Sequence, residues 1–217
     1  MKENDQFAGV IAESLLQINA IKLNLRSPFR WASGLRSPIY CDNRLILSHP
    51  EIRSMVADRF VALIKDQFPD VEMIAGVATG AIAHGVLVAD RLDLPFVYVR
   101  STQKGHGLGS LIEGHFSSDQ QTVIIEDLIS TAKSSLAAYD ALLNAGLHVQ
   151  GMLAIFSYGL AEAVQNLQAA GCTLTTLCDY GALMHYLEKG QQFSDAEMNE
   201  LKTWHANPVA WSAAHKE

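Results

Sequence analysis

Short apolar runs alternate with amphipathic stretches along most of the chain. Five of these runs predict buried strands, because they are rich in β-branched or other apolar residues: Met73–Val77, Phe96–Val99, Val123–Ile125, Val149–Phe156 and Leu174–Cys178. Apolar residues recur at helical spacing over 52–64, 136–143 and 160–170, and the small residues of 76–85 lead into a further helix. This alternation predicts an α/β fold with a doubly wound parallel sheet.

The N-terminal part of the chain follows a different pattern. Apolar positions between residues 5 and 18 predict a first amphipathic helix. Between residues 29 and 47, Ser33-Gly34 and Ser37-Pro38 interrupt any helix, and residues 38–42 predict a short strand.

Two helix starts and one helix face are indicated further on. Ser48 with Glu51, and Ser194 with Glu197, have the spacing of capping boxes at the starts of helices. On the last helix Met198, Leu201 and Trp204 form an apolar stripe, which indicates core packing and no chemistry. Nothing in the 217 residues resembles an interdomain linker, so we expect a single domain.

Composition and charge exclude several classes of protein. The chain is 49% hydrophobic and 18% charged, with no apolar run long enough to cross a membrane and no signal peptide, so we expect a cytoplasmic protein. Its net charge of −7 argues against a nucleic-acid partner, because such binding depends on cationic contacts to phosphate. Cys41, Cys172 and Cys178 lack the paired spacing of zinc sites and are interpreted as reduced thiols.

Candidate chemistry is concentrated directly after the strand Val123–Ile125. Glu126 and Asp127 stand at its carboxyl end, where open α/β sheets bind ligands. Residues 130–134 then supply small and hydroxyl side chains before a predicted helix, whose first N–H groups can hold a phosphate. Carboxylates beside a phosphate site indicate a ligand with vicinal hydroxyls and a phosphate, of which ribose 5-phosphate is the simplest. The alternative is an ordinary strand–turn–helix with a solvated acidic turn.

This stretch resembles the signature of phosphoribosyltransferases that bind 5-phosphoribosyl 1-diphosphate, and Glu126-Asp127-Leu128-Ile129-Ser130-Thr131 is similar to the orotate-specific branch. Residues 31–44 resemble the N-terminal segment with which that branch covers the base; otherwise they form a hairpin with an exposed tryptophan. Arg100, Lys104, His106 and Gly107 follow the spacing of the family's catalytic loop; otherwise this glycine-rich stretch is a solvated surface loop. Its Gly-x-Gly-x-Gly run is no dinucleotide fingerprint, because it does not join a strand to a helix.

The resemblance implies a type I phosphoribosyltransferase fold, with a small N-terminal hood of about residues 1–47 and a mobile lid of about 100–116. It implies transfer of the phosphoribosyl group to orotate in pyrimidine biosynthesis, giving orotidine 5′-phosphate and diphosphate. Mg²⁺ is the implied cofactor, held by substrate oxygens and water with no dedicated protein ligands. A homodimer with shared active sites is also implied.

The resemblance assigns roles to residues. The catalytic residues implied are Lys104, Asp127 and Glu126. The residues implied to bind 5-phosphoribosyl 1-diphosphate are Arg100, Lys104, His106, Glu126, Asp127, Leu128, Ile129, Ser130, Thr131, Ala132, Lys133 and Ser134. Ser130, Tyr40 and Arg44 are implied to bind orotate.

Five positions depart from the family's pattern. Ala132 stands where relatives commonly have glycine, and a side chain in a left-handed backbone conformation costs about 1 kcal/mol. Ser101 and Thr102 leave the lid less cationic, which predicts slower turnover. Tyr158 stands where some members have an arginine for the base carboxylate, so Arg44, Ser130 or backbone N–H groups must serve instead. The turn at Gly80 has no side-chain donor and offers backbone contacts to diphosphate.

Two alternative functions share part of these features. Another purine or pyrimidine phosphoribosyltransferase would have the central stretch but lack the segment 33–44 and the loop 104–107. A regulator that senses the same ligand without catalysis would need a basic DNA-binding domain, for which this acidic chain has no room.

Overall fold

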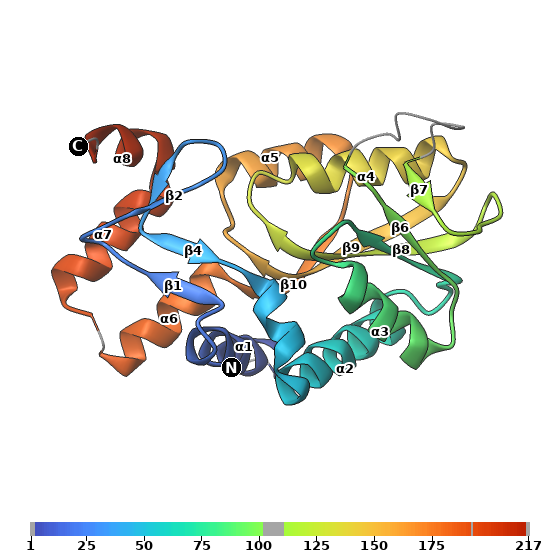
Figure 1. The fold of residues 1–217 in the computed structure, drawn as a ribbon, viewed down its shortest axis with the longest axis horizontal. Helices are drawn as coiled ribbons and strands as arrows, with labels where there is room; N and C mark the ends of the chain where they lie inside the picture. Colours follow the sequence, from blue (N-terminus) through green and yellow to red (C-terminus); the bar gives the residue numbers. More distant parts are fainter. Residues whose placement is uncertain (1–2, 102–110, 192, 216–217) are drawn as a thin grey trace.

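The structure is a computed structural model, which describes residues 3–101, 111–191 and 193–215. Its centre is a six-stranded sheet in the order β10-β9-β8-β5-β6-β7 (Figure 1). The first five strands run parallel, and the short β7 pairs antiparallel with β6 at one edge. The strands are β5 Met73–Val77, β6 Phe96–Val99, β7 Ile112–Glu113, β8 Gln121–Ile129, β9 His148–Ser157 and β10 Leu174–Asp179. The predicted α/β fold with a parallel sheet is therefore confirmed.

Helices cover both faces of this sheet, because alternate side chains of the central strands point to opposite sides. Val123 and Ile125 belong to the core cluster with residues of α1–α3, whereas Ile124 belongs to the cluster with residues of α4 and α5. Figure 1 shows α4 and α5 on one side of the sheet and α2 and α3 on the other. These helices are α1 Glu3–Gln17, α2 Pro50–Gln67, α3 Ile82–Leu92, α4 Lys133–Asn144 and α5 Ala161–Ala170.

A second layer lies beyond the sheet and joins the N-terminal strands to the C-terminal helices (Figure 1). The indole of Trp31 lies 4.9 Å from the ring of Tyr158 and meets Trp204 edge-on. Trp31 also donates a hydrogen bond to the carbonyl of Ile39, so it is held inside this layer and is not an exposed hairpin residue. The elements are β1 Ile21–Leu23, β2 Phe29–Arg30, β3 Arg36–Ser37, β4 Ile39–Cys41, η1 Asn43–Ser48, α6 Tyr180–Gly190, α7 Asp195–Ala206 and α8 Pro208–Ala214.

Of the two capping boxes predicted from the sequence, one is present and the other is not. Ser194 and Glu197 form the predicted capping box of α7. Ser48 does not cap α2: it lies in η1, and α2 begins after His49 with Pro50 in its first turn and no side-chain cap. Proline sets this helix start, because its fixed backbone angle suits the first helical position and its missing N–H needs no partner there.

The apolar stripe of the last long helix packs as expected. Met198, Leu201 and Trp204 are buried in the core cluster. None of the helices in the described part of the chain combines the length and the apolar character needed to cross a bilayer.

Candidate active site

A cavity of about 400 Å³ opens at the carboxyl ends of the neighbouring strands β5 and β8. The helices that follow these strands, α3 and α4, lie on opposite faces of the sheet, and sheets of this kind bind ligands at such a point (Figure 1). Three parts of the chain line it: the end of β4 with the start of η1, the turn after β5, and the end of β8 with the start of α4. The lining residues are Cys41, Asp42, Arg44, Val77, Ala78, Thr79, Gly80, Glu126, Asp127, Leu128 and Ser134. A larger hollow of about 720 Å³ lies between α1, β10 and α6, away from every predicted site residue.

Asp127 is the carboxylate that faces the cavity. A Cβ built on Gly80 would lie only 2.1 Å from Oδ2 of Asp127, so the carboxylate rests directly against the backbone of the turn after β5. That turn contains a cis peptide bond between Ala78 and Thr79. The backbone of Gly80 and the carboxylate of Asp127, both predicted to contact the substrate, therefore lie next to each other.

Glu126 lies beside Asp127 but is held inside the protein. It is 4% exposed and both of its oxygens are engaged: one accepts the N–H of Asp127 at 2.9 Å, and the other accepts the hydroxyl of Ser135 at 2.7 Å. Burial, and then the charge of Asp127, raise the pKa of Glu126 well above its usual range. The sequence motif predicts the same role for the two carboxylates, whereas the structure buries Glu126 and leaves Asp127 at the cavity.

The loop between β8 and α4 has the backbone of a phosphate site. Ala132 is buried and adopts a left-handed conformation with φ 64°. This is the conformation in which a side chain is more costly than the glycine of the relatives. The helix begins at Lys133 without a side-chain cap, so its first N–H groups keep no intrahelical acceptor. Asn166 of α5 donates to the carbonyl of Thr131 at 2.9 Å and fixes the loop from behind. The side chain of Lys133 pairs with Glu162 at 2.7 Å, which leaves its backbone N–H for a phosphate.

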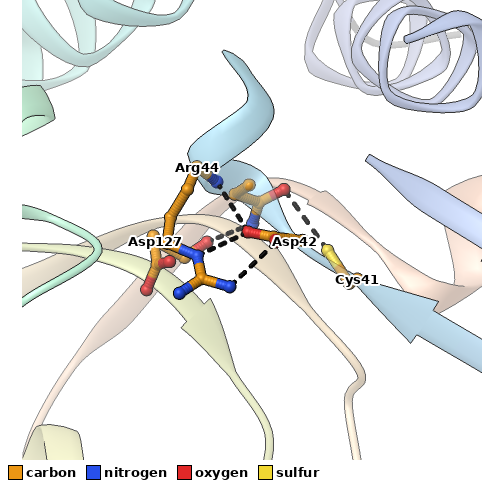
Figure 2. Close-up of polar contacts among 5 residues, drawn as sticks. Cys41, Asp42, Arg44 and Asp127 are labelled. Atoms are coloured by element: carbon orange, nitrogen blue, oxygen red, sulfur yellow. Dashed lines mark hydrogen bonds and ion pairs between the residues drawn. The ribbon is translucent and has the colours of Figure 1, made fainter. Parts of the chain in front are cut away.

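The N-terminal wall of the cavity carries a closely spaced ion pair. Arg44 donates from Nε and from Nη2 to the two carboxylate oxygens of Asp42, at 2.6 and 2.8 Å (Figure 2). The side-chain hydrogen bond from Arg44 lowers the pKa of Asp42, and the same pairing raises the pKa of Arg44. Tyr40 lies outside the cavity lining and packs against Phe29 with ring centroids 5.7 Å apart. Of the three predicted base contacts, Arg44 is the one that borders the cavity.

The cationic segment is only partly described. Arg100 follows β6, and its side chain pairs with Glu113 of β7 at 3.3 Å. Lys104 and His106 lie outside the described residues. Tyr158 is buried under β4, and burial raises the pKa of its hydroxyl, so this side chain does not take over the role of the arginine found in some relatives.

Comparison with known proteins settles the family. The orotate phosphoribosyltransferase of Porphyromonas gingivalis is 48% identical to this chain over 202 residues, which are 93% of this chain and 96% of the relative. The chain belongs to the orotate phosphoribosyltransferase family. A scan against protein-family models gives no match.

Solved structures agree with this assignment of orotate phosphoribosyltransferase. The enzyme from Aeropyrum pernix is 28% identical, with a TM-score of 0.73 over 85% of this chain and 99% of that chain. The UMP synthase of Leishmania donovani shares the fold, with a TM-score of 0.75 at 23% identity over 91% of this chain and 42% of that longer chain. The type I phosphoribosyltransferase fold predicted from the sequence is confirmed.

Three residues of this orotate phosphoribosyltransferase site carry structural roles that the sequence did not reveal. Ser135 holds Glu126, Asp42 holds Arg44, and Asn43 donates to the main-chain carbonyl of Asp127. The first depends on the turn that brings α4 back to the end of β8. The other two depend on contacts that only the folded chain brings together.

Proposed function

We propose that this chain transfers the phosphoribosyl group of 5-phosphoribosyl 1-diphosphate to orotate, forming orotidine 5′-phosphate and diphosphate in pyrimidine biosynthesis. The observation that carries the proposal is the 48% identity, over nearly the full length of both chains, to a protein named orotate phosphoribosyltransferase. The cavity at the carboxyl ends of β5 and β8 supports it, since it joins a carboxylate to an uncapped helix start.

Different residues of the chain bind different parts of the substrate. The N–H groups at the start of α4 receive the 5′-phosphate, and the carboxylate of Asp127 receives the ribose hydroxyls. Glu126, with both oxygens engaged inside the protein, holds the N–H of Asp127 and so orients that carboxylate. The backbone from Ala78 to Gly80 lies next to Asp127 and serves the diphosphate.

The reaction replaces one bond at C1′ of the ribose by another. N1 of orotate loses its proton to water and forms a bond to C1′ of the ribose, while the bond from C1′ to the diphosphate oxygen breaks and the leaving diphosphate takes the electron pair of that bond. Positive charge develops on the ribose in the transition state, which a carboxylate near the ring stabilises. Negative charge develops on the leaving oxygen, which Arg100, Lys104 and His106 neutralise, with Lys104 meeting that oxygen.

Mg²⁺ fits this cavity as a cofactor held mainly by the substrate. Among the described residues no group of three or more His, Cys, Asp or Glu side chains is placed to hold a metal ion. Asp127 offers hard carboxylate oxygens beside the diphosphate position, and Mg²⁺ commonly binds through one or two carboxylates together with substrate phosphates and water. When bound, the ion would neutralise charge on the diphosphate.

Arg44 is the side chain proposed for the orotate carboxylate, with the hydroxyl of Ser130 as a second contact. Arg44 stays charged at every working pH, and it is 62% exposed at the cavity edge, so a carboxylate can reach it. Asp42 already binds two of its nitrogens, which fixes the guanidinium and leaves further donors for the base.

The proposed enzyme works as a cytoplasmic homodimer in which Lys104 reaches the partner's site. The sequence resemblance supports both the dimer and the location.

The test is an assay of Mg²⁺-dependent diphosphate release with orotate, uracil, hypoxanthine and adenine as separate acceptors. Orotate alone should support turnover. Equal rates with uracil or hypoxanthine would contradict the proposed base. A requirement for Mg²⁺ is checked by adding and removing a chelator in the same assay.

A further inference from the structure

The strand that carries Asp127 continues beyond its neighbour in the sheet. β5 and β8 pair from Met73 with Thr122 to Gly76 with Ile125, and β8 then runs on to Ile129. Past Ile125 one edge of β8 still pairs with β9, as far as Ile129 with Ser157. The other edge borders the cavity, because β5 turns away at Val77. Buried main-chain groups need hydrogen-bond partners, so this edge of β8 must find one outside the sheet.

Asn43 supplies that partner from the N-terminal layer. Its side-chain amide nitrogen donates to the main-chain carbonyl of Asp127 at 2.5 Å, across 84 positions of sequence. A carbonyl only accepts hydrogen bonds, so the NH₂ group of Asn43 must face it. The amide oxygen then faces the thiol of Cys41, which donates to it at 3.3 Å, so both ends of the amide are bound.

The surroundings leave Asn43 little freedom. Its side chain is 1% exposed, and it opens η1 directly after Asp42, whose carboxylate caps the N–H of Arg44. The N–H of Asp42 also donates to the carbonyl of Ala20 at 2.8 Å, which ties this turn to the segment before β1. Because the turn around Asn43 is held in place, its hydrogen bond can hold the backbone of Asp127 in position.

We propose that Asn43 is a positioning residue for the phosphoribosyl transfer, through the backbone of Asp127. It replaces the missing ladder partner of β8 at the residue that bears the ribose carboxylate. The carboxylate of Asp127 is thereby kept against Gly80, and the wall that carries Arg44 is kept in register with it. Asn43 itself touches no substrate. This inference rests on the proposed function, because it assigns a role within that reaction.

The decisive variant is Asn43→Asp, which preserves shape and removes the donor. An ionised carboxylate facing the Asp127 carbonyl repels it, so kcat at pH 8.5 should fall by at least about tenfold, as misplaced reacting groups typically cause. A protonated carboxyl can donate to the same carbonyl. The ratio of variant to wild-type kcat should therefore rise as the pH is lowered from 8.5 to 6.

Other titratable groups near Asn43 are present in both proteins. They are Asp127 and Glu126 on β8, Cys41 on β4, His84 on α3 and the pair of Asp42 with Arg44. Burial lowers the pKa of His84 and raises that of Cys41, and both groups are common to the variant and the wild type. Dividing by the wild-type profile removes their common contribution.

Two further proteins complete the experiment. Asn43→Ala should lose a similar factor of kcat but show no rise in the ratio at low pH. Ser194→Ala removes the cap of α7 far from the cavity, and it should lower the thermal midpoint without changing kcat. Calorimetric midpoints of all four proteins separate folding from catalysis.

The outcomes distinguish this inference from the proposed function. A wild-type protein inactive with orotate refutes the function before any variant is compared. An active wild type with Asn43→Asp and Asn43→Ala both within twofold of its kcat refutes the positioning role. A loss of kcat in Asn43→Asp that is the same at pH 6 and pH 8.5 also refutes it, because the donor would then be irrelevant.

Discussion

The carboxylate of Asp127 lies directly over the Cα of Gly80, where an added Cβ would come within 2.1 Å of Oδ2. Real atoms do not approach so closely, so the turn after β5 and the end of β8 are shaped for one another. Ribose and diphosphate groups of one substrate would meet at this contact. The absence of a side chain at position 80 is therefore a requirement of the site and not only of the turn.

Gly80→Ala should abolish most of the activity while the protein remains folded. The new methyl group displaces either the carboxylate or the turn, and a displacement of about 1 Å can reduce turnover about a hundredfold. We expect a loss of kcat/KM for 5-phosphoribosyl 1-diphosphate on that order, measured by steady-state kinetics, with an unchanged circular dichroism spectrum.

Gly9→Ala is the matched control for this substitution. Gly9 lies in α1, and a Cβ there would meet nothing within 4 Å. Activity should be unchanged and the thermal midpoint slightly raised, because alanine favours a helix interior over glycine. If Gly80→Ala also retains full activity, the carboxylate and the turn can move apart without consequence.

Glu126→Gln should change how stability depends on pH. The pKa of Glu126 is raised in the folded protein, chiefly by burial, above the 4.5 usual for the exposed group. The folded state therefore binds this proton more tightly than the unfolded chain, and the free energy of unfolding falls as the pH rises above 4.5. Glutamine stays neutral in the same shape, so the variant should have a higher free energy of unfolding than the wild type at pH 8.

Urea unfolding at pH 4.5, 6, 7 and 8 measures this difference, which should shrink toward pH 4.5. Glu197→Gln is an informative contrast, because hydrogen bonds from Ser194 lower the pKa of Glu197 at an exposed helix start. Its substitution should lower stability at neutral pH and have less effect in acid. An advantage of Glu126→Gln that is equal at all four pH values would contradict the titration of Glu126.

Arg44→Ala should separate the two substrates. If the guanidinium receives the orotate carboxylate, KM for orotate should rise at least about tenfold, the effect of losing a charge-assisted hydrogen bond of about 1.5–3 kcal/mol. KM for 5-phosphoribosyl 1-diphosphate should change little. Arg91→Ala, which breaks a comparable pair with Asp58 away from the cavity, should leave both values unchanged. An equal rise in both KM values would place Arg44 at the diphosphate instead.

Much of the fold follows from the sequence because buried strands leave a strong pattern. β5 and β6 begin and end at the predicted residues, since each is an uninterrupted apolar run with polar residues or turns beyond it. The strands β2, β3 and β7 have only two residues each, too few to show any periodicity. β2 and β3 form because they pair with each other in a hairpin, and β7 forms because it pairs with β6 at the edge of the sheet.

The candidate site, like the fold, was predictable only where the sequence carries a contiguous pattern. Asp127 and Ala132 lie within a contiguous motif, and the structure places Asp127 at the cavity and Ala132 in a left-handed backbone conformation. The burial of Glu126 follows from the continuation of β8 beyond Ile125, which the apolar pattern alone did not predict because the strand's last residues include two carboxylates. The contact of Asn43 joins residues 84 positions apart, and no local signal reports such a contact.

The proposed dimer makes a prediction that one subunit alone could not fulfil. If Lys104 acts in the partner's site, Lys104→Ala and Asp127→Asn each give nearly inactive homodimers. A mixed dimer then has one site with an intact Asp127 from one chain and an intact Lys104 from the other, and a second site with both defects. Mixing the two inactive proteins under conditions of subunit exchange should restore about half of the normal activity per mixed dimer.

Mass spectrometry of the mixture verifies that exchange has occurred, and the two variants incubated separately are the control. Restoration requires a shared site, because two substitutions within separate sites of separate chains cannot repair one another. If mixed dimers form and no activity returns, Lys104 serves the site of its own chain. Activity that returns in proportion to the mixed-dimer fraction would establish that each catalytic site is built from two chains.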